Sequence, residues 1–167
     1  GTEFETDAVL RHFLLLPEKY ALYTPLPQMI SHVRLCDRLQ DQPVATSWSP
    51  HARAGYTELT LSTRDLPGRF AQIAGTLTSQ GISILSAQLN TRDDAVVIDT
   101  FQVCDEQGQA IVDAEVWRRV DRLLASVISG ERDLEEILAS RHKPSEELAV
   151  SLPAPRLRID NEIASQS

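Results

Sequence analysis

The sequence lacks the features that mark several large classes of protein. It has only two cysteines, Cys36 and Cys104, far apart along the chain, so we expect free, buried thiols in a reducing compartment and no disulfide framework. No segment approaches the roughly 20 apolar residues of a membrane-spanning helix, and none resembles a secretory signal. We therefore predict a cytoplasmic protein with no membrane partner.

Basic runs interleaved with aromatic residues are also missing. The chain has 16 Lys and Arg against 24 Asp and Glu, and its formal net charge is −8. This balance argues against a protein that binds a phosphate backbone. An RNA-recognition motif would need several aromatics and a basic residue in its third strand, whereas residues 96–103 offer only Phe101. We expect no nucleic-acid partner.

Catalytic and metal-binding patterns are equally scarce. There is no glycine-serine phosphate loop, aspartate pair or nucleophile elbow. The four histidines lack metal-ligand spacing and are predicted to be inert surface groups: His12, His32, His51 and His142. Asp99 is an acid in an apolar strand, so it is either a carboxyl with a shifted pKa or, as we prefer, a structural acceptor of backbone N–H groups. We predict no catalytic residue and no metal site in this chain.

What the chain does contain is a strand that runs into a helix through an Asp-Leu-Pro-Gly turn. Residues 56–62 alternate as in a strand, and residues 65–69 form the turn. Pro67 favours a helix start, and Gly68 allows a ligand or another backbone to come close. The N–H groups at such a helix start bind small anions such as a carboxylate. Asp65 can cap the helix or bind an ammonium, but not both with the same oxygen, and we prefer the cap.

The remaining patterns predict an α+β fold. In chain order we expect an apolar segment at 7–16, an extended piece at 20–23, a helix at 25–39, a linker at 41–51, a strand at 56–62, a helix at 70–80, strands at 82–90 and 95–103, a helix after Asp113, a short helix at 134–138 and a strand at 156–160. This order matches the ferredoxin-like βαββαβ arrangement, in which two helices cover one face of an antiparallel sheet.

The domain boundaries follow from the same patterns. Residues 1–6 are interpreted as a cloning remnant, and 7–51 as a helical connector and linker. Residues 52–163 form the folded domain, with an insertion at 131–155. Trp48, in the linker, is interpreted as a packing anchor against the next domain.

Together these residues resemble an ACT domain, a family of amino-acid-binding regulatory modules. The resemblance rests on Asp65-x-Pro67-Gly68, on Gly-Ile-Ser-Ile at 81–84 where such domains often have Gly-Ile-Asn-Ile, and on the hairpin that follows. More specifically, the chain is similar to the first of two tandem ACT domains, with their helical connector, in the bifunctional PII uridylyltransferase/uridylyl-removing enzymes. The segments that carry this similarity are 16–20, 32–35, 91–93, 99–101 and 158–162, with the long insertion before the last of them.

The resemblance implies a regulatory role. ACT domains bind an amino acid where two modules meet, and in this enzyme family the effector is glutamine, which reports nitrogen status. The implied ligand-binding residues are Asp65, Leu66, Pro67, Gly68 and Arg69, with Ile82, Ser83 and Ile84 contributed by a partner module. Leu66 replaces a frequent arginine and so removes a cation from the loop. Asp94 replaces a usual hairpin glycine but tolerates a left-handed backbone.

The implied partners are an amino acid, a second ACT module and the catalytic domains of a parent enzyme. The chain stops at Ser167, before a second module, so we expect a homodimer to supply the pair. The parent is a nucleotidyltransferase with phosphohydrolase activity and would need a divalent metal, whereas no cofactor is expected in this chain. The alternative is a ligand-free module for dimerisation or intramolecular docking, which the apolar residues of 7–39 favour.

Overall fold

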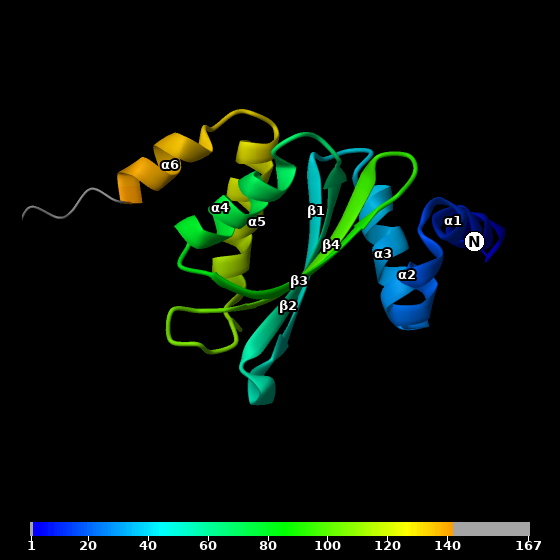
Figure 1. The fold of residues 1–167 in the computed structure, drawn as a ribbon, viewed down its shortest axis with the longest axis horizontal. Coiled ribbons are helices and arrows are strands. Elements are labelled where there is room, and N and C mark those ends of the chain that lie inside the picture. The colour runs from blue at the N-terminus through cyan, green and yellow to red at the C-terminus, as the bar shows by residue number, and fades with distance from the viewer. Residues whose placement is uncertain (1, 142–167) are drawn as a thin grey trace, which may run out of the picture.

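The structure, a computed structural model, describes residues 2–141 as a four-stranded sheet with helices on both faces (Figure 1). The elements in chain order are α1 (Thr2–Leu15), α2 (Glu18–Tyr23), α3 (Leu26–Arg38), β1 (Val44–His51), the 3₁₀ turn η1 (Ala52–Ala54), β2 (Tyr56–Arg64), α4 (Arg69–Ser79), β3 (Ser83–Thr91), β4 (Val96–Cys104), α5 (Ala114–Ile128) and α6 (Leu134–Arg141). The predicted strand at 156–160, most of the insertion and His142 lie outside the described residues.

The strands lie in the order β1-β2-β4-β3, and each is antiparallel to its neighbours. Asp99 of β4 lies opposite Leu61 of β2 on one side and opposite Leu89 of β3 on the other. From β2 onward, the described elements follow the predicted order of strand, helix, strand, strand and helix. The predicted α+β, ferredoxin-like fold with an N-terminal helical extension is confirmed, and β3 lies at one edge of the described sheet.

Each face of the sheet has its own core, because successive side chains of a strand point to opposite faces. Helices α4 and α5 cover one face, and α1 to α3 lie against the other (Figure 1). In β4, Phe101 and Val103 belong to the first core, whereas Ile98 packs with Tyr20 and Met29 in the second. The sheet is therefore the middle layer of three.

The predicted linker at 41–51 is wrong over most of its length, because Val44–His51 forms strand β1. β1 pairs with β2 along its whole length, and Gly55, with a φ of 77°, closes the connection by donating its N–H to the carbonyl of His51 at 3.1 Å. Polar residues and Pro50 suggested a loop. A proline is nevertheless tolerated on an edge strand, where no neighbour needs its missing N–H.

Residues 20–23, predicted as extended, instead belong to helix α2. The N–H of Tyr20 donates to the carbonyl of Pro17 at 2.9 Å, and its side chain is buried. A proline suits the start of a helix, so Pro17 both ends α1 and begins α2. The apolar segment at 7–16 forms the second half of α1 up to Leu15, and the next residue, Leu16, packs with Ile98 of the sheet in the second core.

The helices after the sheet agree with the sequence. Asp113 caps α5 by accepting the N–H of Glu115 at 2.8 Å, as predicted. Trp48 is a packing anchor, also as predicted, but its partner is Trp117 of α5, with ring centroids 5.7 Å apart. The predicted short helix is α6. Within residues 2–141, no helix is long and apolar enough to cross a membrane.

Candidate functional site

The predicted ligand loop forms a tight turn between β2 and α4, which we call the β2–α4 corner (residues 65–70). The N–H of Arg69 donates to the carbonyl of Leu66 at 3.1 Å, and Gly68 has φ 79° and ψ 2°. These angles match the third position of a type II turn, which requires a positive φ, with proline favoured just before it. Pro67-Gly68 is therefore dictated by the turn itself, and a Cβ on Gly68 would meet no atom within 4 Å.

The predicted cap by Asp65 is wrong. The N-cap position of α4 is Gly68, and no side chain accepts a hydrogen bond there. The extra turn displaces the helix start by several residues, which carries Asp65 beyond capping reach. Asp65 instead fixes the corner through its backbone, since its N–H donates to the carbonyl of Ala95 at 2.8 Å. Its exposed carboxylate is thus available to a cation.

Arg69 does not present its charge to the corner. Its side chain is buried and donates to the carbonyls of Arg64 at 3.1 Å and Ile128 at 3.3 Å. Burial lowers the pKa of this guanidinium, and the nearby Asp65 partly opposes that shift. Arg69 therefore ties the start of α4 to the end of α5, where unpaired carbonyls favour a cation. Its role in the structure is to position the corner.

Two main-chain donors remain at the start of α4. The N–H of Arg69 is used in the turn, and that of Gln72 donates to Gly68 at 3.0 Å. The N–H groups of Phe70 and Ala71 have no acceptor among residues 2–141. Beside them, residues 65–70 line a surface hollow of about 460 Å³. The corner can therefore offer N–H donors to an anion and one carboxylate to a cation.

The other predicted ligand residues lie at the opposite end of α4. Ile82 is buried, and its N–H donates to Leu77 at 3.1 Å, while Ser83 is exposed and Ile84 is half-buried at the start of β3. α4 has 11 residues, so about 16 Å of helix separates these residues from the corner. One copy of the chain does not bring the two groups together, and their meeting across two modules stays a prediction.

Asp99 lies in the sheet near the corner. Its side chain is only 6% exposed. Burial raises the pKa of Asp99 to about 6, an effect that the backbone N–H of Asn90 opposes and that the carboxylate of Asp65 adds to. Asp99 therefore accepts a backbone N–H, as in the interpretation we preferred, and its pKa is also shifted, as in the alternative. The ionised carboxylate is costly to the fold at neutral pH.

We expect Asp99→Asn to raise the free energy of unfolding at pH 7 by about 1–2 kcal/mol, since a neutral amide keeps the acceptor and removes the buried charge. The gain should fade as the pH falls through 6 towards 4, where Asp99 is itself protonated. Denaturant unfolding at pH 7 and pH 4 measures both values, with the exposed Asp93→Asn as control. A loss of stability at pH 7 would contradict the assignment.

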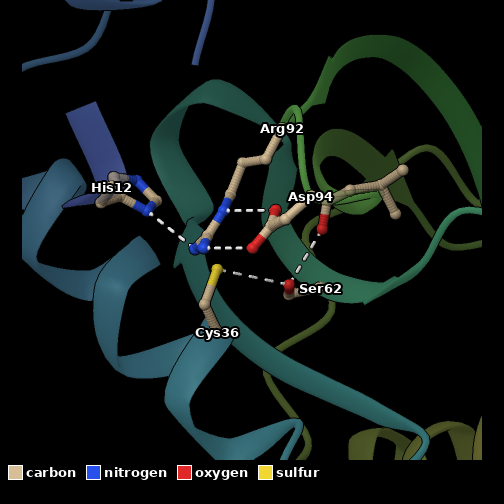
Figure 2. Close-up of polar contacts among 6 residues, drawn as sticks. His12, Cys36, Ser62, Arg92 and Asp94 are labelled. Atoms are coloured by element: carbon tan, nitrogen blue, oxygen red, sulfur yellow. Dashed lines mark hydrogen bonds and ion pairs between the residues drawn. The ribbon is translucent and has the colours of Figure 1, made fainter. Parts of the chain in front are cut away.

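A second polar cluster lies on the other face of the sheet, where α1 and α3 meet the β3–β4 hairpin (Figure 2). Arg92 donates to both oxygens of Asp94, at 3.0 and 2.7 Å, and its Nη1 lies 3.4 Å from Nδ1 of His12. Cys36 Sγ lies 3.6 Å from Ser62 Oγ. Burial raises the pKa of the Cys36 thiol.

The cluster continues into the core through Tyr20. Nε2 of His12 lies 3.2 Å from Tyr20 Oη, which in turn lies 2.5 Å from Nδ1 of His32. Since arginine can only donate, Arg92 donates to His12, His12 donates to Tyr20, and Tyr20 donates to Nδ1 of His32, so both histidines must be neutral. The prediction that His12 and His32 are surface groups is therefore wrong. The apolar residues on the face of α1 that carries His12 could have indicated from the sequence that this histidine is buried.

The β3–β4 turn also differs from its prediction. The left-handed residue is Ala95, with a φ of 60°, and not Asp94. Asp94 instead holds Arg92, and the N–H of Asp93 donates to the carbonyl of Leu15 at 2.8 Å, which docks the turn on α1. Contacts with the helical extension thus shape this turn.

The remaining predictions of reactive groups concern thiols and metals. Cys36 and Cys104 are free thiols, as predicted, with Cys104 buried and Cys36 half-buried. Across residues 2–141, no group of three or more His, Cys, Asp and Glu could hold a metal ion.

Comparison with known proteins gives one consistent relationship. The chain is 31% identical over 160 residues, 95% of its length, to the bifunctional uridylyltransferase/uridylyl-removing enzyme of Gluconobacter oxydans. It is 30% identical over 137 residues, 80% of its length, to the enzyme of the same name from Rhodospirillum rubrum. The chain spans 15% and 14% of these two relatives. No family model matches it.

Proposed function

From the premise that this chain is homologous to one segment of the bifunctional uridylyltransferase/uridylyl-removing enzymes, we propose that it is an ACT-type regulatory module that binds an amino acid, with glutamine as the first candidate. The observation that carries the proposal is the β2–α4 corner with the exposed Asp65, beside the N–H groups of Phe70 and Ala71 that have no acceptor among residues 2–141. The parent would be a cytoplasmic PII uridylyltransferase, a nucleotidyltransferase that needs a divalent metal, and the module would report nitrogen status to its catalytic domains.

The chemistry of the corner suits a free amino acid. The carboxylate of the amino acid would accept hydrogen bonds from the N–H groups of Phe70 and Ala71, where the helix dipole also favours negative charge. Its ammonium would lie towards the carboxylate of Asp65, which no cap occupies. Leu66 and Phe70, each about half exposed, offer apolar surface to the ligand's side chain. The guanidinium of Arg69 donates to the carbonyls of Arg64 and Ile128, so we propose no contact between this charge and the ligand.

A homodimer through β3 would complete this site. β3 lies at the sheet edge with Leu85 57% and Leu89 53% exposed, an arrangement that invites pairing with another strand. The end of β3 at Thr91 lies on the side of the corner, since Asp65 bonds to Ala95 in the following turn. Antiparallel pairing of two β3 strands would therefore place residues 82–84 of a second copy beside this corner.

The test is a calorimetric titration with L-glutamine at millimolar concentration, repeated on Gly68→Asn. Asparagine tolerates the left-handed backbone, and its side chain would fill the open corner, so the fold should survive and glutamine affinity should fall about tenfold or more. Gly108→Asn is the matched control, because Gly108 has a φ of 73° and equally open surroundings far along the chain. Equal affinity in the two variants would remove the corner from the proposal.

The second candidate function is a ligand-free module for dimerisation or docking. It is favoured by the exposed leucines of β3 and by a set of exposed apolar side chains on the helical extension: Leu10, Leu14, Leu22, Tyr23 and Leu26. The same titration separates the two candidates. If none of the twenty amino acids binds and the chain still forms a dimer in light scattering, docking becomes the preferred function.

A further inference from the structure

A cavity of about 730 Å³ lies between the helical extension and the sheet, on the opposite face from α4 and α5. Its walls come from α1, α3, the end of β2 and the β3–β4 turn, around the cluster of Figure 2. This volume is within the range of small-molecule sites in proteins, roughly 300–1,000 Å³. We call it the extension cavity.

The extension cavity is lined by equal numbers of opposite charges. The ionisable side chains are Arg11, Arg64 and Arg92 against Asp7, Asp37 and Asp94. Arg92 and Asp94 already satisfy each other in a two-point ion pair. Among residues 2–141, the side chains of the other four have no hydrogen-bond or ion-pair partner.

This distribution selects one class of ligand. A guanidinium fork matches the two oxygens of a carboxylate, and the two unpaired arginines come from different elements of the wall, Arg11 from α1 and Arg64 from the end of β2. A ligand with negative charge alone would meet repulsion from Asp7 and Asp37. A molecule that carries both a carboxylate and an ammonium can satisfy both sets.

The extension cavity is separate from the β2–α4 corner, although Arg64 of the cavity is next to Asp65 of the corner in the sequence. Strand geometry sends successive side chains to opposite faces, so Arg64 points with Ser62 towards α3, whereas Asp65 belongs to the corner. We propose that the extension cavity is a binding site for a small zwitterion with the chemistry of a free amino acid, held by Arg11 and Arg64 through its carboxylate and by Asp37 and Asp7 through its ammonium.

The test screens the twenty amino acids by thermal shift on the Gly68→Asn variant, in which the corner is filled, and titrates the strongest one by calorimetry. We expect binding that weakens about tenfold or more when Arg11→Gln and Arg64→Gln are added, because two charge-assisted contacts are lost. Both arginines are exposed, so the fold should be unchanged. Arg34→Gln, an exposed arginine of α3 outside the cavity, is the control and should leave affinity unaltered.

Three results would overturn the site: no amino acid binds the Gly68→Asn variant, the double arginine variant binds as tightly as its control, or acetate alone binds as tightly as the amino acid. The experiments can contradict the proposal for the corner and the proposal for the cavity independently. Loss of glutamine binding in Gly68→Asn without any effect of the arginine variants would support the corner and refute the cavity. The reverse pattern would do the opposite.

Discussion

Trp117→Ala is expected to lower the free energy of unfolding by about 3–5 kcal/mol, the usual loss when a large aromatic is removed from a core. Trp117 is 1% exposed, and its ring stacks on Trp48 of β1. It thus joins α5 to the strand that the sequence did not reveal. Chemical denaturation followed by circular dichroism measures the loss, with Val112→Ala, an exposed site, as the control that should change stability by less than about 0.5 kcal/mol.

Trp117→Phe separates packing from hydrogen bonding. The indole Nε1–H donates to the carbonyl of Ile111 at 3.2 Å, and that carbonyl also accepts from Thr57 Oγ1 at 2.9 Å. The acceptor therefore stays paired in the phenylalanine variant, and we expect a loss of only about 1–2 kcal/mol. If Trp117→Ala cost no more than the Val112 control, the placement of α5 on the sheet would be wrong.

Acidification from pH 7 to pH 4 is expected to weaken the attachment of the helical extension. Burial lowers the pKa of His12 to about 4, assisted by Arg92 and His32 and opposed by Asp94. Burial also lowers the pKa of His32 to about 4. Because the hydrogen-bond order requires both rings to be neutral, protonation of either one breaks the link between α1, α2 and α3.

The two histidines lower the stability on acidification because the unfolded chain takes up their protons more readily than the folded chain. An unfolded histidine binds a proton below about pH 6.5 and the folded one only near pH 4, so stability falls across this window, by at most about 3 kcal/mol for each histidine. Asp99 acts in the opposite direction, because its raised pKa makes the folded state take up a proton below pH 6. The resulting gain in stability offsets the loss caused by about one histidine. The net change is a loss.

Hydrogen exchange of the α1 amides at pH 7 and pH 4.5, corrected for the intrinsic rate, measures this loss directly. The double variant His12→Asn and His32→Asn should have lower protection at pH 7 and little further change on acidification. His51→Asn is the control, because the ring of His51 stacks on Tyr56, with ring centroids 4.9 Å apart, and takes no part in the buried histidine pair. Unchanged protection of α1 in the natural chain at pH 4.5 would contradict the buried histidine pair.

Periodicity and turn chemistry were enough to predict the strands β2, β3 and β4 and the helices α3, α4, α5 and α6. These elements carry local signals, such as the alternation in 56–62, the Asp113 cap and the Pro67-Gly68 turn. The candidate corner was likewise found from sequence, because the type II turn needs proline and glycine at fixed places. Conformations set by neighbouring residues can be derived from sequence alone.

Only the tertiary structure decided the rest. β1 is a strand because β2 lies beside it, and His12 is buried because α1 folds onto the β3–β4 turn. The guanidinium of Arg69 is held at the end of α5, although the residue itself lies in the predicted loop. The buried histidines depend on partners farther along the chain, 12 residues away for Tyr20 and His32 and 80 residues away for Arg92 and His12. Local sequence carries no record of such partners, because burial and charge pairing are fixed only when distant segments pack together.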